Sequence, residues 1–161
     1  MGIIEFLRQT AVGNILLTII MAMVPIVEVR GAIPYGIAMG LDSRLVIAVS
    51  LFGSMIPVPF IVLFIRRIFA WLRVRSAVLE RLISALERRT LEKGSQVNKY
   101  KALGLVVFSA LPLPGTGAWS GALLAALLNI RLIKALPLIF VGVMIDVLVV
   151  TGIVYGVRFL L

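Results

Sequence analysis

The residues with the clearest chemical potential are two charges inside an apolar run. Glu28 and Arg30 lie in the segment VPIVEVRGAIPYGIAMG, where Pro25, Gly31 and Pro34 can interrupt a helix. A carboxylate can bind a proton or a cation, and a guanidinium can hold an anionic group. An anion that occupies Arg30 would make Glu28 easier to protonate, because a nearby guanidinium favours the ionised carboxylate. The structural alternative is that Glu28 and Arg30 form an ion pair that only holds the surrounding elements together.

A second group of candidate residues occupies the uncharged segment PLPGTGAWSG. Its prolines would end one short helix, and its glycines would let backbone amides turn toward a ligand at the start of the next helix, a position that favours anions. Its tryptophan could stack on a substrate or anchor the chain at the membrane interface. The candidates for binding a substrate or ion here are Pro112, Pro114, Gly115, Thr116, Gly117, Trp119 and Ser120.

Two further candidates are more isolated in the sequence. Asp146 lies within the last apolar stretch, where an acidic side chain is a functional hypothesis by default. It is expected to be either a second proton site or an ion-pair partner for Arg30. Tyr35 could donate a hydrogen bond near Glu28 or could only pack.

The composition narrows the chemistry. The chain has 161 residues, is 61% hydrophobic and has a mean hydropathy of +1.15, whereas water-soluble domains are usually about 45–50% apolar. It has no cysteine and no histidine, which excludes disulfides and thiol chemistry and removes the commonest metal ligands. Any proton coupling must therefore use carboxylates. We expect a membrane protein that is not an enzyme and that needs no cofactor or metal.

The apolar segments differ in length. Residues 45–65 and 132–157 are long enough to cross a bilayer, and Pro57 and Pro59 are expected to kink the first of them. The other apolar pieces are too short for a full crossing. We therefore predict re-entrant hairpins at 16–41 and 102–129. The alternative is that residues 10–41 form one or two complete but kinked spans.

An internal repeat is suggested by two matching segments. LDSRLVIAVSL, which begins at Leu41, aligns with LNIRLIKALPL, which begins at Leu128, at an offset of 87 residues. The alternative is chance similarity between leucine-rich segments. The predicted fold is thus an all-α integral membrane protein with one domain, 1–161, in which 10–65 and 102–157 are inverted copies of a hairpin followed by a span.

The segment 66–101 between the two halves carries ten basic and three acidic residues. The positive-inside rule places it in the cytoplasm and the multi-pass chain in the cytoplasmic (inner) membrane, and it argues against nucleic acid as a partner. Part of it has the spacing of a basic amphipathic helix, which could lie on the inner leaflet or pack on a partner subunit. The small-residue motif GIVYG, from Gly152 to Gly156, favours a homo-oligomer, with a dimer as the simplest form, surrounded by membrane lipids.

The chain also carries a family resemblance. VEVRGAIPYGIAMG, PVPFIVLFIRR and LPLPGTGAWSGALLAALL resemble the prokaryotic membrane proteins named "putative small multidrug export protein", from about Leu16 to Gly156. That family is similar to the DedA (VTT-domain) superfamily, which implies two oppositely directed re-entrant hairpins, flipping of phosphorylated lipid carriers and proton-coupled transport. The DedA pattern distributes charges over both hairpins, whereas 102–129 has none here.

Together these observations predict a transporter of an amphipathic, anionic, phosphorylated lipid-like substrate, driven by proton- or sodium-coupled alternating access. A multidrug exporter of cationic amphiphiles is the alternative. A cationic substrate would prefer an unpaired Glu28 beside aromatic groups, and aromatic residues are few in this chain. A non-transporting membrane assembly or scaffold protein is a third reading.

Overall fold

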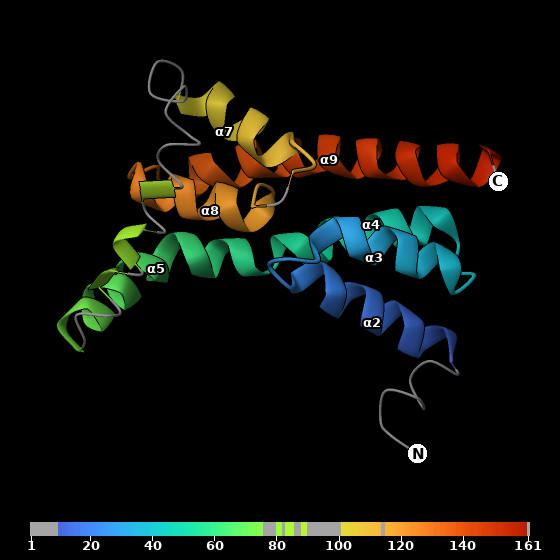
Figure 1. Ribbon diagram of the computed structural model, residues 1–161, viewed down its shortest axis with the longest axis horizontal. Helices are drawn as coiled ribbons and strands as arrows, with labels where there is room; N and C mark the ends of the chain where they lie inside the picture. Colours follow the sequence, from blue (N-terminus) through green and yellow to red (C-terminus); the bar gives the residue numbers. More distant parts are fainter. Residues whose placement is uncertain are drawn as a thin grey trace.

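A computed structural model describes residues 10–75, 80–81, 83–85, 88–89, 101–113 and 115–160. These residues are helical apart from short turns and connections, and none of them lies in a β-strand, which confirms the predicted all-α class. Pro114 and most of the proposed amphipathic helix lie outside the described residues. The helices are α2 (Ala11–Met23), α3 (Glu28–Ala38), α4 (Ser43–Met55), α5 (Pro57–Arg75), α7 (Lys101–Ala110), α8 (Ala118–Leu127) and α9 (Leu132–Leu160) (Figure 1).

Helices α2 and α3 form the first hairpin. The side chain of Thr10 caps α2 by accepting a 3.1 Å hydrogen bond from the Gly13 amide, so this helix begins before residue 16, where the predicted hairpin started. Residues 24–27 make the turn. Helix α3 then continues through Gly31 and Pro34, contrary to the expectation that these residues break it. A proline removes one helical hydrogen bond but is tolerated where neighbouring groups satisfy the backbone.

The first long helical stretch is interrupted once. Gly40, with φ of 76°, ends the turn after α3, and the Asp42 side chain caps α4 by accepting from the Arg44 and Leu45 amides. Ile56 separates α4 from α5, which begins at Pro57, as the predicted kink requires. Helix α5 continues to Arg75, so the first part of the basic segment is an extension of this helix.

Helices α7 and α8 form the second hairpin, joined by residues 111–117. A left-handed residue, Asn129 with φ of 56°, then ends the turn after α8 and leads into α9. The bounds of these elements agree with the predicted segments 102–129 and 132–157 to within a few residues.

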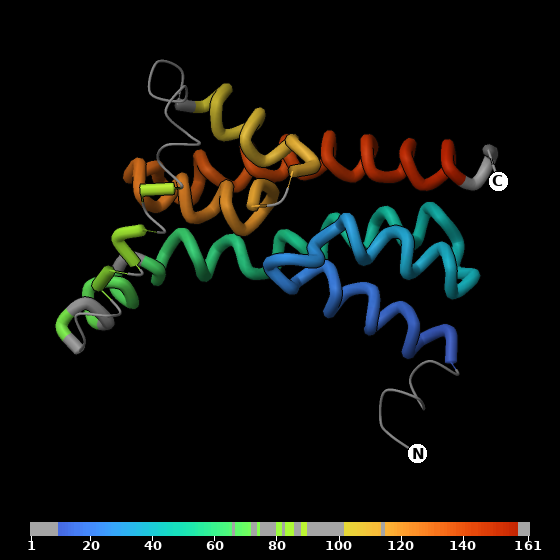
Figure 2. The backbone as a smooth tube through the Cα atoms, in the orientation of Figure 1, coloured from blue at the N-terminus to red at the C-terminus, as the bar shows by residue number. Residues whose placement is uncertain are grey.

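The two hairpins approach each other from opposite ends of the molecule, with their turns near its middle (Figure 1). The α4–α5 stretch and α9 run along the long axis in opposite directions, as the colour change along the tube also shows (Figure 2). Helix α9 packs on α3, α4, α5, α7 and α8. Buried side chains such as Ile33, Leu105, Leu124 and Ile139 form the core between them.

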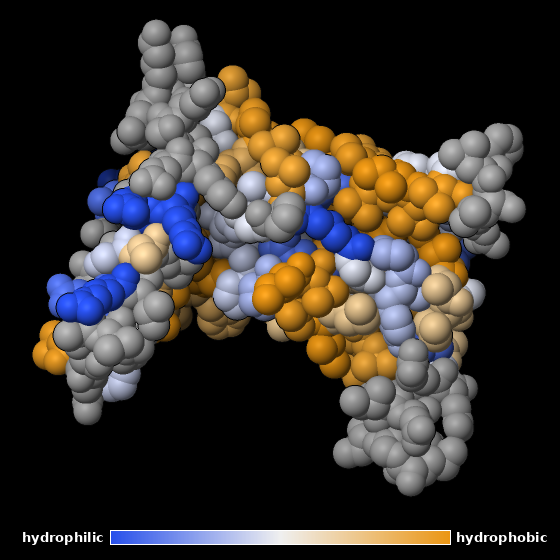
Figure 3. Space-filling view, viewed as in Figure 1, coloured by the Kyte–Doolittle hydropathy of each residue, from blue (hydrophilic) through white to orange (hydrophobic). Residues whose placement is uncertain are grey.

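Among the residues that the structure describes, two helical stretches are long and apolar enough to cross a membrane, Ser43–Ile65 and Leu132–Val157. Many large apolar side chains outside the core are exposed, including Phe52, Phe60 and Leu148, each more than half exposed. Apolar surface covers much of one face of the molecule, whereas hydrophilic surface gathers at one end and near the middle (Figure 3). An apolar surface of this extent suits a lipid environment.

Candidate functional site

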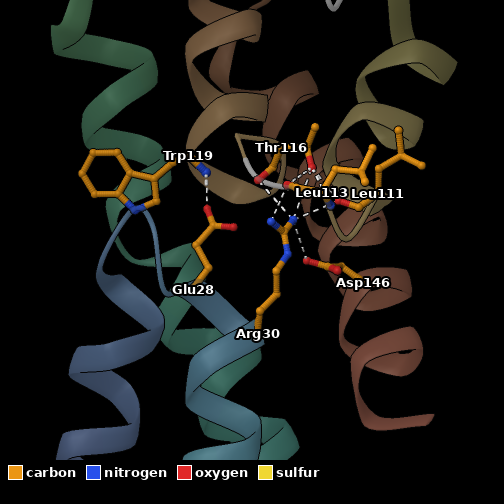
Figure 4. Close-up of polar contacts among 7 residues, drawn as sticks. All are labelled: Glu28, Arg30, Leu111, Leu113, Thr116, Trp119 and Asp146. Atoms are coloured by element: carbon orange, nitrogen blue, oxygen red, sulfur yellow. Dashed lines mark hydrogen bonds and ion pairs between the residues drawn. The ribbon is translucent and has the colours of Figure 1, made fainter. Parts of the chain in front are cut away.

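The turns of the two hairpins bring three charged side chains together (Figure 4). Glu28 is the first residue of α3 and is 3% exposed. Its Oε1 accepts a 3.1 Å hydrogen bond from the Trp119 amide, in the first turn of α8. Gly117, the N-cap residue of α8, has no side chain to do this, so Glu28 caps a helix of the other hairpin. The carboxylate therefore occupies the place at the start of α8 where an anion was expected.

The backbone at this contact has an uncommon conformation on both sides. Glu28 has φ of 45°, a left-handed value that few non-glycine residues adopt. Gly117 has φ of 112° and ψ of −159°, a region open essentially to glycine alone. A Cβ atom on Gly117 would lie 2.0 Å from Glu28 Oε2. The glycine predicted to aim amides at a ligand thus gives the Glu28 carboxylate its space.

Arg30 lies two residues further along α3 and binds the connection between α7 and α8. Its Nη1 donates to the Leu113 carbonyl, and its Nη2 lies 2.9 Å from the Leu111 carbonyl and 3.2 Å from that of Thr116. The Thr116 hydroxyl donates to the carbonyls of Leu111 and Leu113 and so folds the same connection. A guanidinium suits this task because its donors form a fixed fork.

Asp146 completes the cluster from α9. Its Oδ2 lies 3.5 Å from Arg30 Nη2, and its side chain is 1% exposed, against 21% for Arg30. The ion pair is one of the two roles expected for Asp146. Its other oxygen, Oδ1, and the Arg30 Nε are buried and have no hydrogen-bond partner within the described part of the chain. Glu28 forms no ion pair with Arg30 within 4 Å, so the alternative in which these two charges pair with each other is not seen, although each of them joins the two hairpins.

Trp119 borders an apolar cavity beside the charged cluster. The cavity has a volume of about 280 Å³ and lies between α5, α8 and the first turn, with Phe69 and Ser120 in its lining. The indole Nε1 of Trp119 donates a 2.9 Å hydrogen bond to the Met23 carbonyl, the last residue of α2. This role as a helix cap was not among the two expected for the tryptophan. Because its amide binds Glu28, Trp119 contacts both the cavity and the carboxylate.

The remaining predicted residues either lie outside the polar cluster or support its backbone without contributing a charged group. Tyr35 donates to Asn14 Oδ1 at 3.2 Å and links α3 to α2. Gly31 allows close packing, since a Cβ there would lie 2.3 Å from Val27 Cγ1. Pro112 and Gly115 belong to the connection that Arg30 holds, and Gly115 has φ of 82°.

Two kinds of group were not predicted. The carbonyls of Leu111 and Leu113 are backbone atoms, which the residue types do not reveal. Asn14 is buried, and its signal was present as the one amide side chain in the mostly apolar segment 11–24.

Over the described residues the fold defines an all-helical protein with two stretches long and apolar enough to cross a membrane, which favours a membrane location. Residues 28–149 match the family described as "Putative small multi-drug export protein", and the chain belongs to that family. The match includes all three charged residues of the cluster. No curated protein and no solved structure matches the chain.

Proposed function

We propose that the protein exports cationic amphiphiles across the membrane in exchange for protons, with Glu28 as the exchanging carboxylate. The observation that carries this proposal is the separation of the two charges. Arg30 forms an ion pair with Asp146 and donates to backbone carbonyls, whereas Glu28 forms no ion pair within 4 Å among the described residues. An unpaired carboxylate beside an aromatic residue is what a cationic substrate would prefer.

The charge balance of the cluster supports the same proposal. Two carboxylates and one guanidinium leave one negative charge in excess when all three are ionised. A buried excess charge is costly, and one proton or one substrate cation would neutralise it. The apolar cavity beside Trp119 offers space for the hydrophobic part of such a substrate, and aromatic faces attract cations.

We propose that the two halves are inverted repeats whose hairpins are re-entrant. Support comes from the starts of the two long stretches and the turns before them, which repeat at a spacing of 89 residues. Ser43 and Leu132 begin α4 and α9, and Gly40 and Asn129 are the left-handed residues in the turns before them. Glu28 and Gly117, which face each other, have the same spacing. The sequence alignment at 87 residues is thus displaced by two positions.

Alternating access would then consist of rocking one hairpin against the other around the cluster at the molecule's middle. Two oppositely directed re-entrant hairpins are the fold that the resemblance to the DedA superfamily implies. The basic end of the molecule is the end where α5 finishes and α7 and α9 begin, with Arg131 and Lys134 at the start of α9 (Figure 1). It faces the cytoplasm in this proposal, because lysine and arginine favour that side.

We also propose a homodimer that forms through α9. A Cβ atom on Gly152 or Gly156 would meet no other atom within 4 Å, so packing within the described chain does not require either glycine. Glycines four residues apart on an apolar helix allow close contact with another helix.

The decisive experiment is transport in vesicles. Glu28→Gln keeps an acceptor for the Trp119 amide and removes the charge. In vesicles with a pH gradient, the wild type should accumulate the lipophilic cation tetraphenylphosphonium, and E28Q should fall to the level of protein-free vesicles. Asp42→Asn is the control, because asparagine caps a helix as well as aspartate does and residue 42 lies outside the cluster. Unchanged transport by E28Q would contradict the proposal and favour the scaffold reading.

An anionic, phosphorylated lipid-like substrate is the second candidate. It is favoured by Arg30, whose side chain is 21% exposed and whose Nε is unpartnered. Movement of a fluorescent polyprenyl phosphate by the wild type, lost in Arg30→Gln, together with no movement of tetraphenylphosphonium, would support this candidate.

A further inference from the structure

A second pocket lies at the basic end of the molecule, away from the charged cluster. It has a volume of about 370 Å³ and is formed by the first turn of α7, the turn after α8 and the first two turns of α9. Ala102 contributes from α7, and Arg131 and Lys134 contribute from the start of α9. Both cationic side chains are exposed, and no acidic residue is among the described residues that line the pocket.

The position of these two cations is opposite to what the helix itself favours. The start of a helix carries partial positive charge, which stabilises acidic side chains and disfavours basic ones. At the start of the other long stretch the Asp42 cap offsets the one cation in the first turn of α4, Arg44. Helix α9 instead has Lys134 in its first turn, preceded by Arg131, and neither α7 nor α9 has an acidic residue in its first turn. An anion in the pocket would balance the positive potential of both side chains and both helix ends.

The rest of the lining indicates which anion fits. Leu128, Ile130 and Leu138 give the pocket an apolar wall beside its basic rim. Lys134 and Leu138 are one turn apart on α9, a helix that is long and apolar enough to cross a membrane. A ligand with a charged head and an apolar body matches this arrangement, whereas a free phosphate ion would leave the apolar wall unused. Basic pockets between membrane helices are suited to anionic headgroups.

We propose that this pocket binds the headgroup phosphate of an anionic phospholipid from the leaflet at the basic end of the molecule. Arg131 and Lys134 contact the phosphate, and the first part of an acyl chain lies against Leu138. The site does not depend on the proposed transport, because it shares no residue with the Glu28 cluster or the Trp119 cavity.

Native mass spectrometry of the full chain in detergent tests the proposal. Phosphatidylglycerol, phosphatidylcholine with the same acyl chains, and glycerol 1-phosphate are added in separate titrations. We expect phosphatidylglycerol to bind more tightly than the other two. The variant R131Q/K134Q should weaken its binding by about 10- to 30-fold, since each cation near an anionic headgroup contributes about 1 kcal/mol.

Two further variants sharpen the result. Arg44→Gln removes an exposed cation from the first turn of α4 and should leave binding unchanged. Ala102→Trp places a bulky side chain in the pocket from an exposed position and should weaken binding while both cations remain. Equal binding of phosphatidylglycerol and phosphatidylcholine would overturn the proposal. So would equal binding by wild type and R131Q/K134Q, or binding of glycerol 1-phosphate as tight as that of the lipid.

Discussion

Glu28 and Gly117 depend on each other at the point where the two hairpins meet. The carboxylate reaches the start of α8 only because position 117 has no Cβ atom, and α8 obtains its cap only because residue 28 reaches across. Left-handed backbone at a non-glycine residue costs free energy and persists where the surroundings enforce it. The strained backbone of Glu28 therefore indicates that its carboxylate is held at this buried position for a functional reason.

Gly117→Ala tests this dependence through stability. We expect a loss of at least about 2 kcal/mol, because the substitution both occupies a region reserved for glycine and displaces the carboxylate. Thermal unfolding in detergent measures it. Gly40→Ala is the control, since φ is also positive there but nothing lies within 4 Å of its Cβ position. In a Glu28→Ala background the cost of Gly117→Ala should shrink, and an undiminished cost would show that the carboxylate is not what the alanine displaces.

The charged residues of the site could be predicted from the sequence, but their partners could not. Glu28, Arg30 and Asp146 were identifiable because ionised side chains inside apolar runs are costly and rare. The partner of Arg30 could not be chosen, since the alternatives depend on how two separate hairpins approach each other. The carbonyls that Arg30 binds have no signature in the residue types.

At the scale of elements, the lengths of apolar segments predicted the architecture well. Bilayer thickness fixes the length of a span, so 45–65 and 132–157 could be identified without the structure. The continuation of α3 through Pro34 was not predicted, because packing around a helix can outweigh a local breaker. The extension of α5 beyond residue 65 was missed because hydropathy marks the end of a membrane segment and not the end of its helix.

Close packing of α9 on α7 depends on Gly142. A Cβ atom there would lie 2.6 Å from the Val106 carbonyl oxygen and 2.6 Å from Ser109 Cβ. A backbone atom cannot move aside as a flexible side chain can, so α7 itself would have to shift. We expect Gly142→Ala to lower the free energy of unfolding by about 1–3 kcal/mol, measured by thermal unfolding in detergent.

Gly152→Ala on the same helix is the matched control for this packing. Its Cβ position is open, and alanine is the better helix former, so stability should stay unchanged or rise by up to about 1 kcal/mol. Alanine also keeps the small-residue spacing of the proposed dimer face. Equal losses from the two substitutions would mean that the cost comes from the helix backbone and not from contact with α7.

At the scale of the whole molecule, the direction of each half determines where its ends lie. Helix α3 ends and α4 begins at one end of the long axis, whereas α7 and α9 begin at the other (Figure 1). Residues in these two groups must therefore face opposite sides of a membrane if the long axis crosses it. Hydrophilic surface at the end where α5 finishes (Figure 3) fits a position in water.

The absence of cysteine makes this arrangement directly testable, because any single cysteine can be labelled on its own. Met39→Cys and Ala102→Cys replace exposed, uncharged residues at the two ends and leave the charge distribution that orients the chain unchanged. A membrane-impermeant maleimide should label Met39→Cys in intact cells and Ala102→Cys only after the membrane is opened, with the cysteine-free parent as the blank. Labelling of both from the same side would contradict the inverted arrangement, and with it the proposal that Glu28 lies midway between two aqueous faces.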